Sequence, residues 1–341
     1  MNPLLYIPWF QLSLWEIPAP FAGHHEFLGM SFDMPETWGV HPFGLLVAAG
    51  VLLGASVAER RGKALGIRPS AVAHCAAFVL LPAFIVAHVF DAIFYHPEVV
   101  MERPALVLEL WNGLSSFGGF LGACMGGLYW AHSRKVPIRV IADPIAFSFP
   151  FGWLFGRLGC FGVHDHPGRV TMFFLGVEDY HVGFPPYQVR HDLGFYEVLF
   201  CLVTIPLFIA LAQKERPTGF FLMLLPILYA PVRFGLDFLR ATDVEMPDTR
   251  YFGLTPAHYS AFVLLAGGLW VLWEIRRNPK LEIPDSIALR PSDGLMLSMA
   301  LPVEDALPVE DEVAEEPDEV AAPVGEEAPQ ECAPDPERRE P

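Results

Sequence analysis

The sequence predicts an all-α integral membrane protein with seven transmembrane helices and a polar cap loop over one end of the bundle. Three observations predict this fold class. The chain of 341 residues is 53% hydrophobic. Its formal charge of −17 at pH 7 is concentrated at the C-terminal end, so the rest is strongly apolar. Seven apolar segments each reach about 20 residues, the length that a helix needs to cross the hydrocarbon core of a bilayer.

The seven predicted spans follow one another between residues 40 and 277, which is the expected membrane domain. Several contain Pro or Gly, which membrane helices tolerate where neighbouring helices or water satisfy the freed backbone groups. In the third span, small residues recur between 118 and 127 and predict close packing against another helix. The spans are expected at 40–58, 71–95, 113–132, 138–161, 193–213, 218–240 and 256–275.

The two ends of the chain differ from this domain. Residues 1–39 are broken by prolines and lack the basic start and cleavage site of a signal peptide, so we expect an interfacial segment. From residue 278 the chain is rich in Asp, Glu, Pro, Ala and Val, which bury too little apolar surface to offset the entropy of ordering. A disordered acidic tail is therefore expected over 278–341. The five cysteines show no paired spacing, which indicates neither a disulfide framework nor a zinc site.

The distribution of Lys and Arg between the loops predicts the orientation, because short cytoplasmic loops carry an excess of both. One side has Arg60, Arg61, Lys63, Arg68, Arg134, Lys135, Arg139, Lys214, Arg216, Arg276, Arg277 and Lys280. The other side has Arg103, Arg169, Arg190, Arg240 and Arg250. The N-terminus is therefore expected outside, with the tail in the cytoplasm. The longest loop, over 162–192, would then cap the outer mouth of the bundle.

Two arginines, Arg157 and Arg233, lie inside predicted spans, where a charged group is expensive unless it pairs or lines a wet cavity. Tyr229, Arg233 and Asp237 recur every four residues and share one helix face, with Arg240 three residues further. Arg157 could instead extend its head to the interface, and Arg233 could simply neutralise Asp237. We favour a phosphate-binding pair, because planar guanidinium groups suit bidentate binding of phosphate oxygens. In a membrane, a lipid headgroup is the available phosphate.

Three separated motifs resemble the prolipoprotein diacylglyceryl transferases. They are Pro150-Phe151-Gly152 with Gly156-Arg157-Leu158-Gly159, then Arg190-His191 with Tyr196-Glu197, then Tyr229, Arg233, Asp237-Phe238 and Arg240. The resemblance covers all seven predicted spans. It implies transfer of the diacylglyceryl group of phosphatidylglycerol to a lipobox cysteine thiol, with release of glycerol phosphate and no cofactor, at the outer face of a bacterial inner membrane. The implied partners are phosphatidylglycerol, the signal-peptide region of a prolipoprotein and membrane lipids, with no nucleic acid.

The resemblance also implies roles for individual residues. Arg157 and Arg233 stand at the family's two essential arginines and are expected to bind the phosphate and stabilise the charge of the leaving group. Asp143 stands at another family position, and Asp165 and Asp237 stand where glutamates are usual. The residues implied in substrate binding, besides the two arginines, are Gly168, His191, Tyr196, Glu197, Tyr229, Asp237 and Arg240.

Four positions depart from the family pattern. Phe117 stands where the third span of the family has a histidine, and Cys160 replaces an asparagine. Phe43 lies in a segment that is Trp-Tyr-Gly in the family, and His88 replaces an arginine. Two alternatives therefore stay open. One is a divergent paralogue that moves a lipid group to another acceptor, and the other is a non-catalytic phospholipid-binding scaffold.

His164, Asp165 and His166 follow the arginine motif and are candidates for the base that the third span lacks. Asp165 can orient an imidazole and raise its basicity, and imidazole titrates near neutral pH. A solvated loop with adjacent histidines is one alternative. A metal site that combines His164 and His166 with His181 or His191 is another, ranked last because residues i and i+2 bind one metal only in extended geometry.

Overall fold

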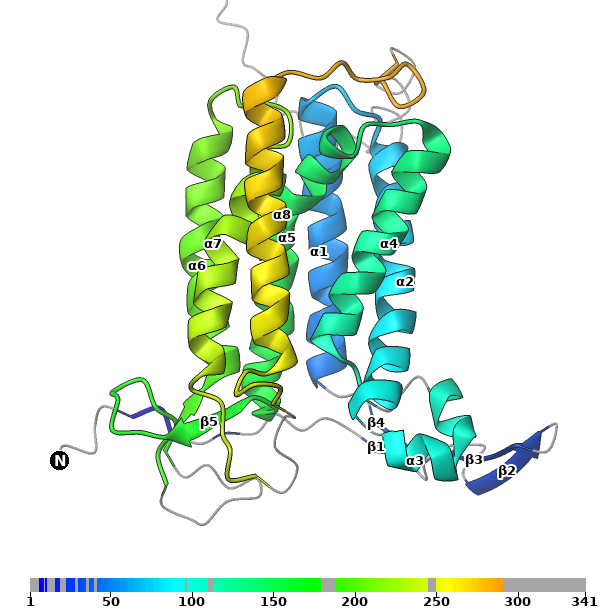
Figure 1. Cartoon of the computed structure of the whole chain (residues 1–341), viewed down its shortest axis with the longest axis vertical. Helices are drawn as coiled ribbons and strands as arrows, with labels where there is room; N and C mark the ends of the chain where they lie inside the picture. Colours follow the sequence, from blue (N-terminus) through cyan, green and yellow to red (C-terminus); the bar gives the residue numbers. More distant parts are fainter. Residues whose placement is uncertain are drawn as a thin grey trace, which may run out of the picture. The chain divides into compact units, whose positions relative to one another are not determined.

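In the computed structural model, the described part of residues 1–295 is mainly helical. Its long helices run side by side, and the short strands gather at one end (Figure 1). The described residues are 6–8, 10, 16–18, 23–27, 30–34, 37–39, 42–95, 97–109, 113–178, 188–244 and 250–290.

Seven long helices form the bundle within the described residues. They are α1 (Pro42–Ala64), α2 (Pro69–Tyr95), α4 (Ser116–Arg134), α5 (Ile138–Val163), α6 (Leu193–Ala212), α7 (Phe220–Asp237) and α8 (Pro256–Arg277). Each coincides with one predicted span. All except α4, in which glycines replace larger apolar residues, are long and apolar enough to cross a membrane. The predicted all-α membrane fold is therefore confirmed, and the exact number of spans stays a prediction.

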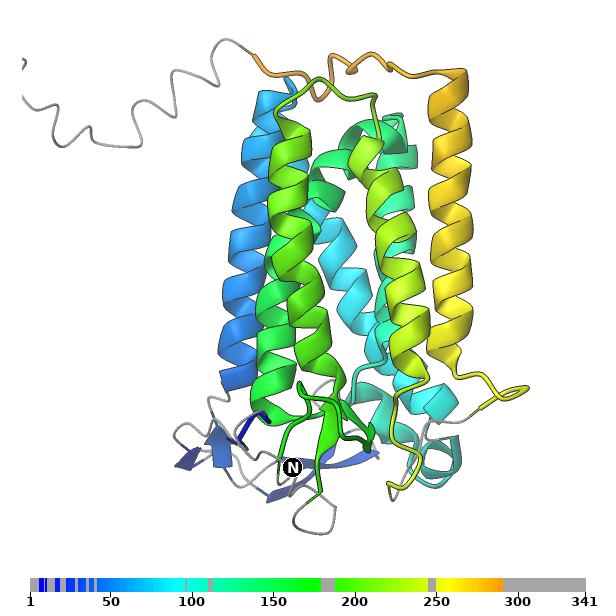
Figure 2. The ribbon, with the colours of Figure 1, turned by 90° about the vertical axis from the view of Figure 1, so that its left-hand side faces the viewer.

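The helices pack chiefly as pairs, with α1 against α5, α2 against α4, α7 against α8, and α6 against α5 (Figures 1 and 2). The α2–α4 contact is closest, because its glycines face the neighbouring backbone. A Cβ atom at Gly122 or Gly126 would collide with the carbonyl oxygens of Pro82 and Phe78, respectively. The close packing predicted from the small residues of the third span is thus confirmed.

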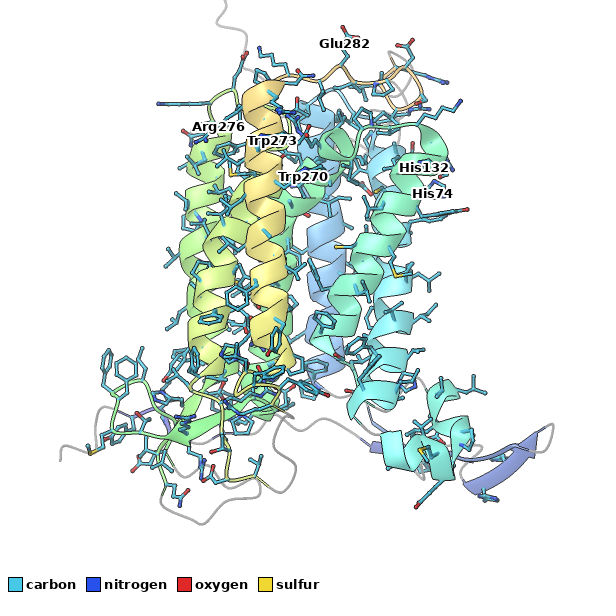
Figure 3. The ribbon with its side chains drawn as sticks, in the orientation of Figure 1. His74, His132, Trp270, Trp273, Arg276 and Glu282 are labelled. Atoms are coloured by element: carbon cyan, nitrogen blue, oxygen red, sulfur yellow. The ribbon has the colours of Figure 1, made fainter. Side chains whose placement is uncertain are left out.

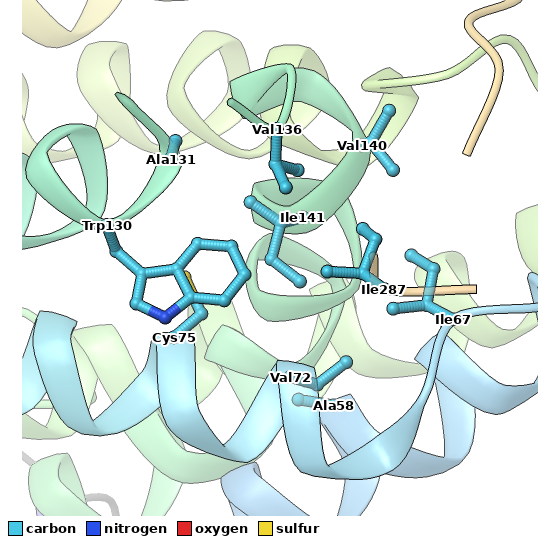
Figure 4. Close-up of a cluster of buried hydrophobic side chains, with 10 residues drawn as sticks. All are labelled: Ala58, Ile67, Val72, Cys75, Trp130, Ala131, Val136, Val140, Ile141 and Ile287. Atoms are coloured by element: carbon cyan, nitrogen blue, oxygen red, sulfur yellow. The ribbon is translucent and has the colours of Figure 1, made fainter. Parts of the chain in front are cut away.

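A hydrophobic core closes the bundle at the end remote from the strands (Figure 4). Trp130 of α4 and Ile141 of α5 are buried there, together with Ile287, which lies beyond α8. The backbone of this last segment bonds to the α1–α2 turn, since Arg68 N donates to Ile287 O at 2.8 Å. Residues 278–290, expected in the tail, are therefore packed chain that belongs with the bundle. The remainder of the expected tail, 291–341, lies outside the described residues.

At the opposite end, the described strands form three antiparallel pairs. These are β1 (Glu16–Pro18) with β4 (Thr37–Gly39), β2 (Gly23–Phe27) with β3 (Met30–Met34), and β5 (Pro167–Val170) with β6 (Arg190–Asp192). Between α2 and α4 lie the short helix α3 (Pro97–Glu102) and the 3-10 helix η2 (Pro104–Leu108). The first four strands fall in the segment 1–39, whose interfacial position stays a prediction.

The β5–β6 pair fixes the predicted cap loop over the bundle. Gly168 of β5 forms a bridge with Arg240, and a Cβ atom there would lie 2.5 Å from the Cβ of His191, so only glycine fits. The fully buried guanidinium of Arg190 donates to Gly168 O at 3.1 Å and pairs with Asp243 at 2.5 Å. The hydrogen bond from Arg190 holds the pKa of Asp243 below its ordinary value. The described parts of this loop, up to residue 178 and from residue 188, are therefore held by specific contacts, as expected of a cap rather than a linker.

Candidate active site

Three charged side chains from three helices meet inside the bundle toward its cap end. Glu197 of α6 is fully buried between Arg157 of α5 and Arg233 of α7. Its Oε1 accepts a hydrogen bond from Arg233 Nη1 at 2.9 Å, and its Oε2 lies 2.9 Å from Arg157 Nε. A buried carboxylate is tolerated only where it is paired and hydrogen-bonded. The structure thus brings together the two predicted arginines and places a carboxylate between them.

Two neutral donors complete the surroundings of Glu197. Tyr229 donates its hydroxyl hydrogen to Oε2 at 2.9 Å, and the indole N–H of Trp153 donates to the same oxygen at 3.0 Å. The guanidinium carbon of Arg157 also lies 4.3 Å from the Trp153 ring centroid, a cation–π distance. Sequence reasoning missed Trp153. Its spacing of four residues before Arg157 on one helix was the signal that could have found it.

Asp237, also fully buried, extends the network to α8. Its Oδ1 lies 3.2 Å from Arg233 Nη2 and 4.0 Å from Arg240 Nη1. Its Oδ2 accepts a hydrogen bond from the Thr255 hydroxyl and lies 3.3 Å from His258 Nδ1. Thr255 and His258 open α8, where the helix dipole also favours a carboxylate. Sequence reasoning missed both, because they reach Asp237 from a different helix.

On its other side, Arg157 faces the imidazole of His166. Arg157 Nη1 lies 3.2 Å from His166 Nε2, and His166 Nδ1 lies 2.5 Å from Asp165 Oδ1. Burial lowers the pKa of His166, and the guanidinium of Arg157 lowers it further, which outweighs the opposite effect of Asp165. Burial raises the pKa of Asp165, but the hydrogen bond with His166 and the charge of Arg157 lower it overall. A neutral ring held by Asp165 at Nδ1 keeps its lone pair on Nε2.

His164 lies in a different environment from His166. It ends α5 in the left-handed region, with φ of 52°, and is 2% exposed. Its Nδ1 lies 2.7 Å from Asp192 Oδ2, and its Nε2 lies 2.8 Å from Phe10 O. Both ring nitrogens of His164 are therefore within hydrogen-bond distance of partners in the protein itself. His164 therefore connects the end of α5 to β6 and to the N-terminal segment. Its predicted role as base has no support from the geometry.

Cys160, Asp165 and His166 place possible ligand atoms within 4.8 Å of one another. Sulfur, carboxylate and imidazole ligands form a set that zinc can use. However, Arg157 Nη1 lies 3.2 Å from His166 Nε2 and 3.7 Å from Cys160 Sγ, and its positive charge opposes a metal cation at this place. We interpret the cluster as a thiol next to a base.

The remaining predicted residues lie in the wall of the cap. His191 Nδ1 lies 2.6 Å from the hydroxyl of Tyr196, and burial lowers the pKa of His191. The alternative metal site also needed His164, whose two ring nitrogens are occupied, and either His191 or His181. His181 lies outside the described residues. That alternative has no support from the geometry of the described histidines, and substrate contacts of His191 and Tyr196 stay predictions.

Two departures from the family pattern lie in the α2–α4 pair. The ring of Phe117 packs edge-on against Phe90, with centroids 5.0 Å apart. His88 is buried, and its nitrogens lie 3.3 Å from Gly113 O and 3.1 Å from Leu106 O. Position 117 thus presents an apolar ring where a histidine would present a base. His166, beside Arg157, is the imidazole that the geometry offers instead.

Comparisons with known proteins agree with this arrangement. The family model described as prolipoprotein diacylglyceryl transferase matches residues 30–274. The chain is 28% identical over 244 residues to the phosphatidylglycerol–prolipoprotein diacylglyceryl transferase of Chromohalobacter salexigens. The matched region covers 70% of this chain and 90% of that protein. It is 31% identical over 182 residues to the protein of the same name from Geobacter sulfurreducens, which covers 53% of this chain and 66% of that protein. The chain belongs to the prolipoprotein diacylglyceryl transferase family.

Proposed function

We propose that this protein is a phosphatidylglycerol–prolipoprotein diacylglyceryl transferase. It would move the diacylglyceryl group of phosphatidylglycerol to the cysteine thiol of a lipobox and release glycerol phosphate. The observation that carries the proposal is the convergence of Arg157 and Arg233 on one buried point, next to the imidazole of His166. A thiol nucleophile needs a base, and a phosphate leaving group needs fixed positive charge.

Arg157 and Arg233 would bind the phosphate of the lipid. Each guanidinium has five N–H donors, and Glu197 uses only some of them. Arg157 Nε is buried 2.9 Å from Glu197 Oε2, yet it has no hydrogen-bond partner of normal geometry in the part of the chain that is described. A phosphate oxygen would supply the missing acceptor. In the absence of lipid, Glu197 keeps the two like charges side by side.

His166 would take the proton of the acceptor thiol. Such a thiol, with a pKa of about 8.5, is mostly protonated at pH 7. Once Arg157 turns toward the phosphate, the lone pair on His166 Nε2 becomes available, while Asp165 holds the other ring nitrogen. The thiolate attacks the glyceryl carbon that bears the phosphate. A C–S bond forms as the C–O bond breaks, and the electron pair leaves on the oxygen of glycerol phosphate.

We place the protein in a bacterial inner membrane, with the N-terminus outside and the chain beyond α8 in the cytoplasm. The support is the excess of Lys and Arg in the loops at the end remote from the cap. The cap and the arginine pair would then serve the outer leaflet. Reporter fusions at Pro69 and Pro279 test this orientation, and an outward signal at Pro279 would reverse it.

The activity is tested with purified protein in vesicles that contain phosphatidylglycerol. A lipobox peptide should gain the mass of a diacylglyceryl group in step with the release of glycerol phosphate. Two matched controls are used. The same peptide with serine in place of its cysteine should not react, and the Arg233→Ala protein should react far more slowly than wild type. Transfer to another acceptor, with no transfer to any lipobox peptide, would replace the proposal with the divergent paralogue. Lipid binding without any turnover would replace it with a scaffold.

A further inference from the structure

The turn before α8 holds an exposed phenylalanine in an unfavourable backbone conformation. Tyr251 and Leu254 exchange backbone hydrogen bonds at 2.8 and 3.0 Å, and the two residues between them have positive φ, 51° at Phe252 and 81° at Gly253. Such a turn suits Gly or Asn at both positions, whereas positive φ is unfavourable for a bulky side chain. Phe252 is 101% exposed, so its ring gains no packing from the described protein that would offset this strain.

The turn is continuous with the apolar outer surface of α8. It projects sideways from the bundle at the end where α8 begins (Figure 2). The hydroxyl of Tyr259 on α8 donates to Tyr251 O at 2.7 Å and ties the turn to this helix. Exposed apolar side chains continue along α8, a candidate span, at Phe262, Val263, Leu269, Trp270 and Trp273. Figure 3 labels the last two. A surface that faces lipid along the helix therefore leads directly to Phe252.

The cap loop has a second apolar tip at the same end of the bundle. Met172, Phe173 and Phe174 are all exposed, and the loop that follows β5 also extends sideways (Figure 1). Contiguous exposed apolar side chains mark a surface that contacts something else. An arginine precedes each tip, Arg169 before the cap-loop tip and Arg250 before the turn at Phe252. Aromatic side chains next to basic ones are typical of the boundary between water and lipid.

We propose that Phe252 and the tip 172–174 insert into the lipid leaflet that surrounds the cap end of the bundle. Arg169 and Arg250 then lie at the level of the headgroups, where anionic lipid attracts them. Both tips therefore bind the lipid surface itself rather than another protein. Insertion removes the Phe252 ring from water and so accounts for its exposure in a strained turn. It also fixes the depth of the bundle near Arg157, a consequence that rests on the proposed function, whereas the anchoring does not.

A fluorescent probe on one introduced, exposed cysteine tests the proposal, since the native Cys75, Cys160 and Cys201 are buried. The full chain, with Cys124→Ser and Cys332→Ser, carries an environment-sensitive dye at Phe252→Cys in vesicles of phosphatidylglycerol and phosphatidylethanolamine. Two further positions serve as references for a lipid and a water environment. Val263→Cys on α8 reports lipid, and Glu282→Cys, exposed at the opposite end (Figure 3), reports water. Spin-labelled lipid should quench the dye at position 252, and iodide should not reach it. Its emission maximum should lie at a shorter wavelength than that of the dye at position 282.

Three outcomes would overturn the proposal. The first is iodide quenching at position 252 equal to that at position 282. The second is quenching by spin-labelled lipid that is absent at 252 but present at 263. The third is shielding that disappears when protein is diluted with lipid, which would indicate a second copy of the chain. Met172→Cys repeats the test if the Phe252→Cys protein does not fold. Because no step measures transfer, a failed transferase assay leaves this result intact.

Discussion

Charged side chains are buried at both ends of the bundle, but they are satisfied by different partners. At the end remote from the cap, Asp143 of α5 accepts from the backbone N–H groups of Phe221 and Leu222 at 2.7 and 3.2 Å. Nearby, Arg139 donates to Thr218 O at 2.7 Å. These contacts satisfy backbone groups at the start of α7 and the turn before it, which have no partner within the helix. Removing them would disturb the helix itself.

In the network around Glu197 at the cap end, buried charges are instead satisfied by other side chains. Arg157 and Arg233 share Glu197, and Arg233 also contacts Asp237. Side chains can rotate without breaking a helix, so a ligand can replace one partner while the backbone stays in place. The comparison teaches that charges bonded to backbone hold the fold, whereas charges bonded to one another can exchange a partner for substrate.

The most far-reaching effect is expected of Arg233→Ala, which should weaken both turnover and phosphatidylglycerol binding. Loss of a preorganised donor to the leaving group should lower turnover by about 10²–10³-fold, and Arg233→Lys should behave more like Ala than like wild type, because it lacks the planar fork. Turnover and phosphatidylglycerol binding are the measurements. Arg139→Ala, the matched variant at the other end, should lower thermal stability but keep turnover per folded molecule. Wild-type lipid binding by Arg233→Ala would break the comparison.

An effect on turnover of similar size should distinguish two histidines that are two residues apart. His166→Ala should lower turnover by about 10²–10⁴-fold and leave lipid binding intact, as expected for loss of a general base. His164→Ala should instead lower the thermal midpoint, because it removes the contacts with Asp192 and Phe10. If both variants keep full activity, His166 is not the base.

The pH dependence sharpens the same contrast. A general base works only when unprotonated, and burial lowers the pKa of His166 below its ordinary value of about 6.5. Turnover should therefore be level around pH 7 and fall as the pH drops through this lowered pKa. Asp165→Asn removes the partner that raises the pKa of His166, so the acid limb should move to lower pH. An acid limb above pH 7 in the wild type would contradict this assignment.

At the remote end, the prediction concerns stability alone. Ile287→Ala should lower the free energy of unfolding by about 2–5 kcal/mol, because Ile287 is 3% exposed in the core cluster that also contains Trp130. Truncation after Arg290 is the control and should change neither stability nor turnover. Equal stability of the Ile287→Ala and wild-type proteins would show that the segment beyond α8 is not part of the packed core.

The smallest expected effect is that of Asp143→Ala. It leaves two backbone N–H groups of α7 without their acceptor, which should cost about 1–3 kcal/mol of stability. Turnover per folded molecule should stay unchanged, because the lost contacts hold a helix end rather than a substrate. Thermal melting and the transfer assay together decide the matter. A loss of turnover beyond the loss of folded protein would extend the active site to this end.

Hydropathy alone predicted the long helices, because an apolar segment of membrane length has few other stable structures. The helical repeat placed Arg233 and Asp237 on one face, and the motifs indicated that Arg157 belonged with them. The partner between the arginines, Glu197, was predicted only as a family position. Its place depends on how α5, α6 and α7 pack, which no local pattern records.

The distinction between His164 and His166 could not be predicted from the sequence. Both are imidazoles in one short stretch, and Asp165 is adjacent to each. The positive φ of His164 turns the chain at the end of α5, so that one ring meets Asp192 and the other meets Arg157. Such a backbone conformation follows from tertiary contacts of the cap rather than from the identity of the residue.

The position of Ile287 beyond the last helix has a consequence for the order of folding. Trp130 and Ile141, its neighbours in the core, are synthesised well before it. That core stays incomplete while α6, α7 and α8 enter the membrane, and it closes only after residue 287 has left the ribosome. Final packing of the first helices is thus delayed until every helix has been made. A nascent chain that stops before this point would leave the apolar side chains of this core partly uncovered, and such surface makes a chain prone to aggregation.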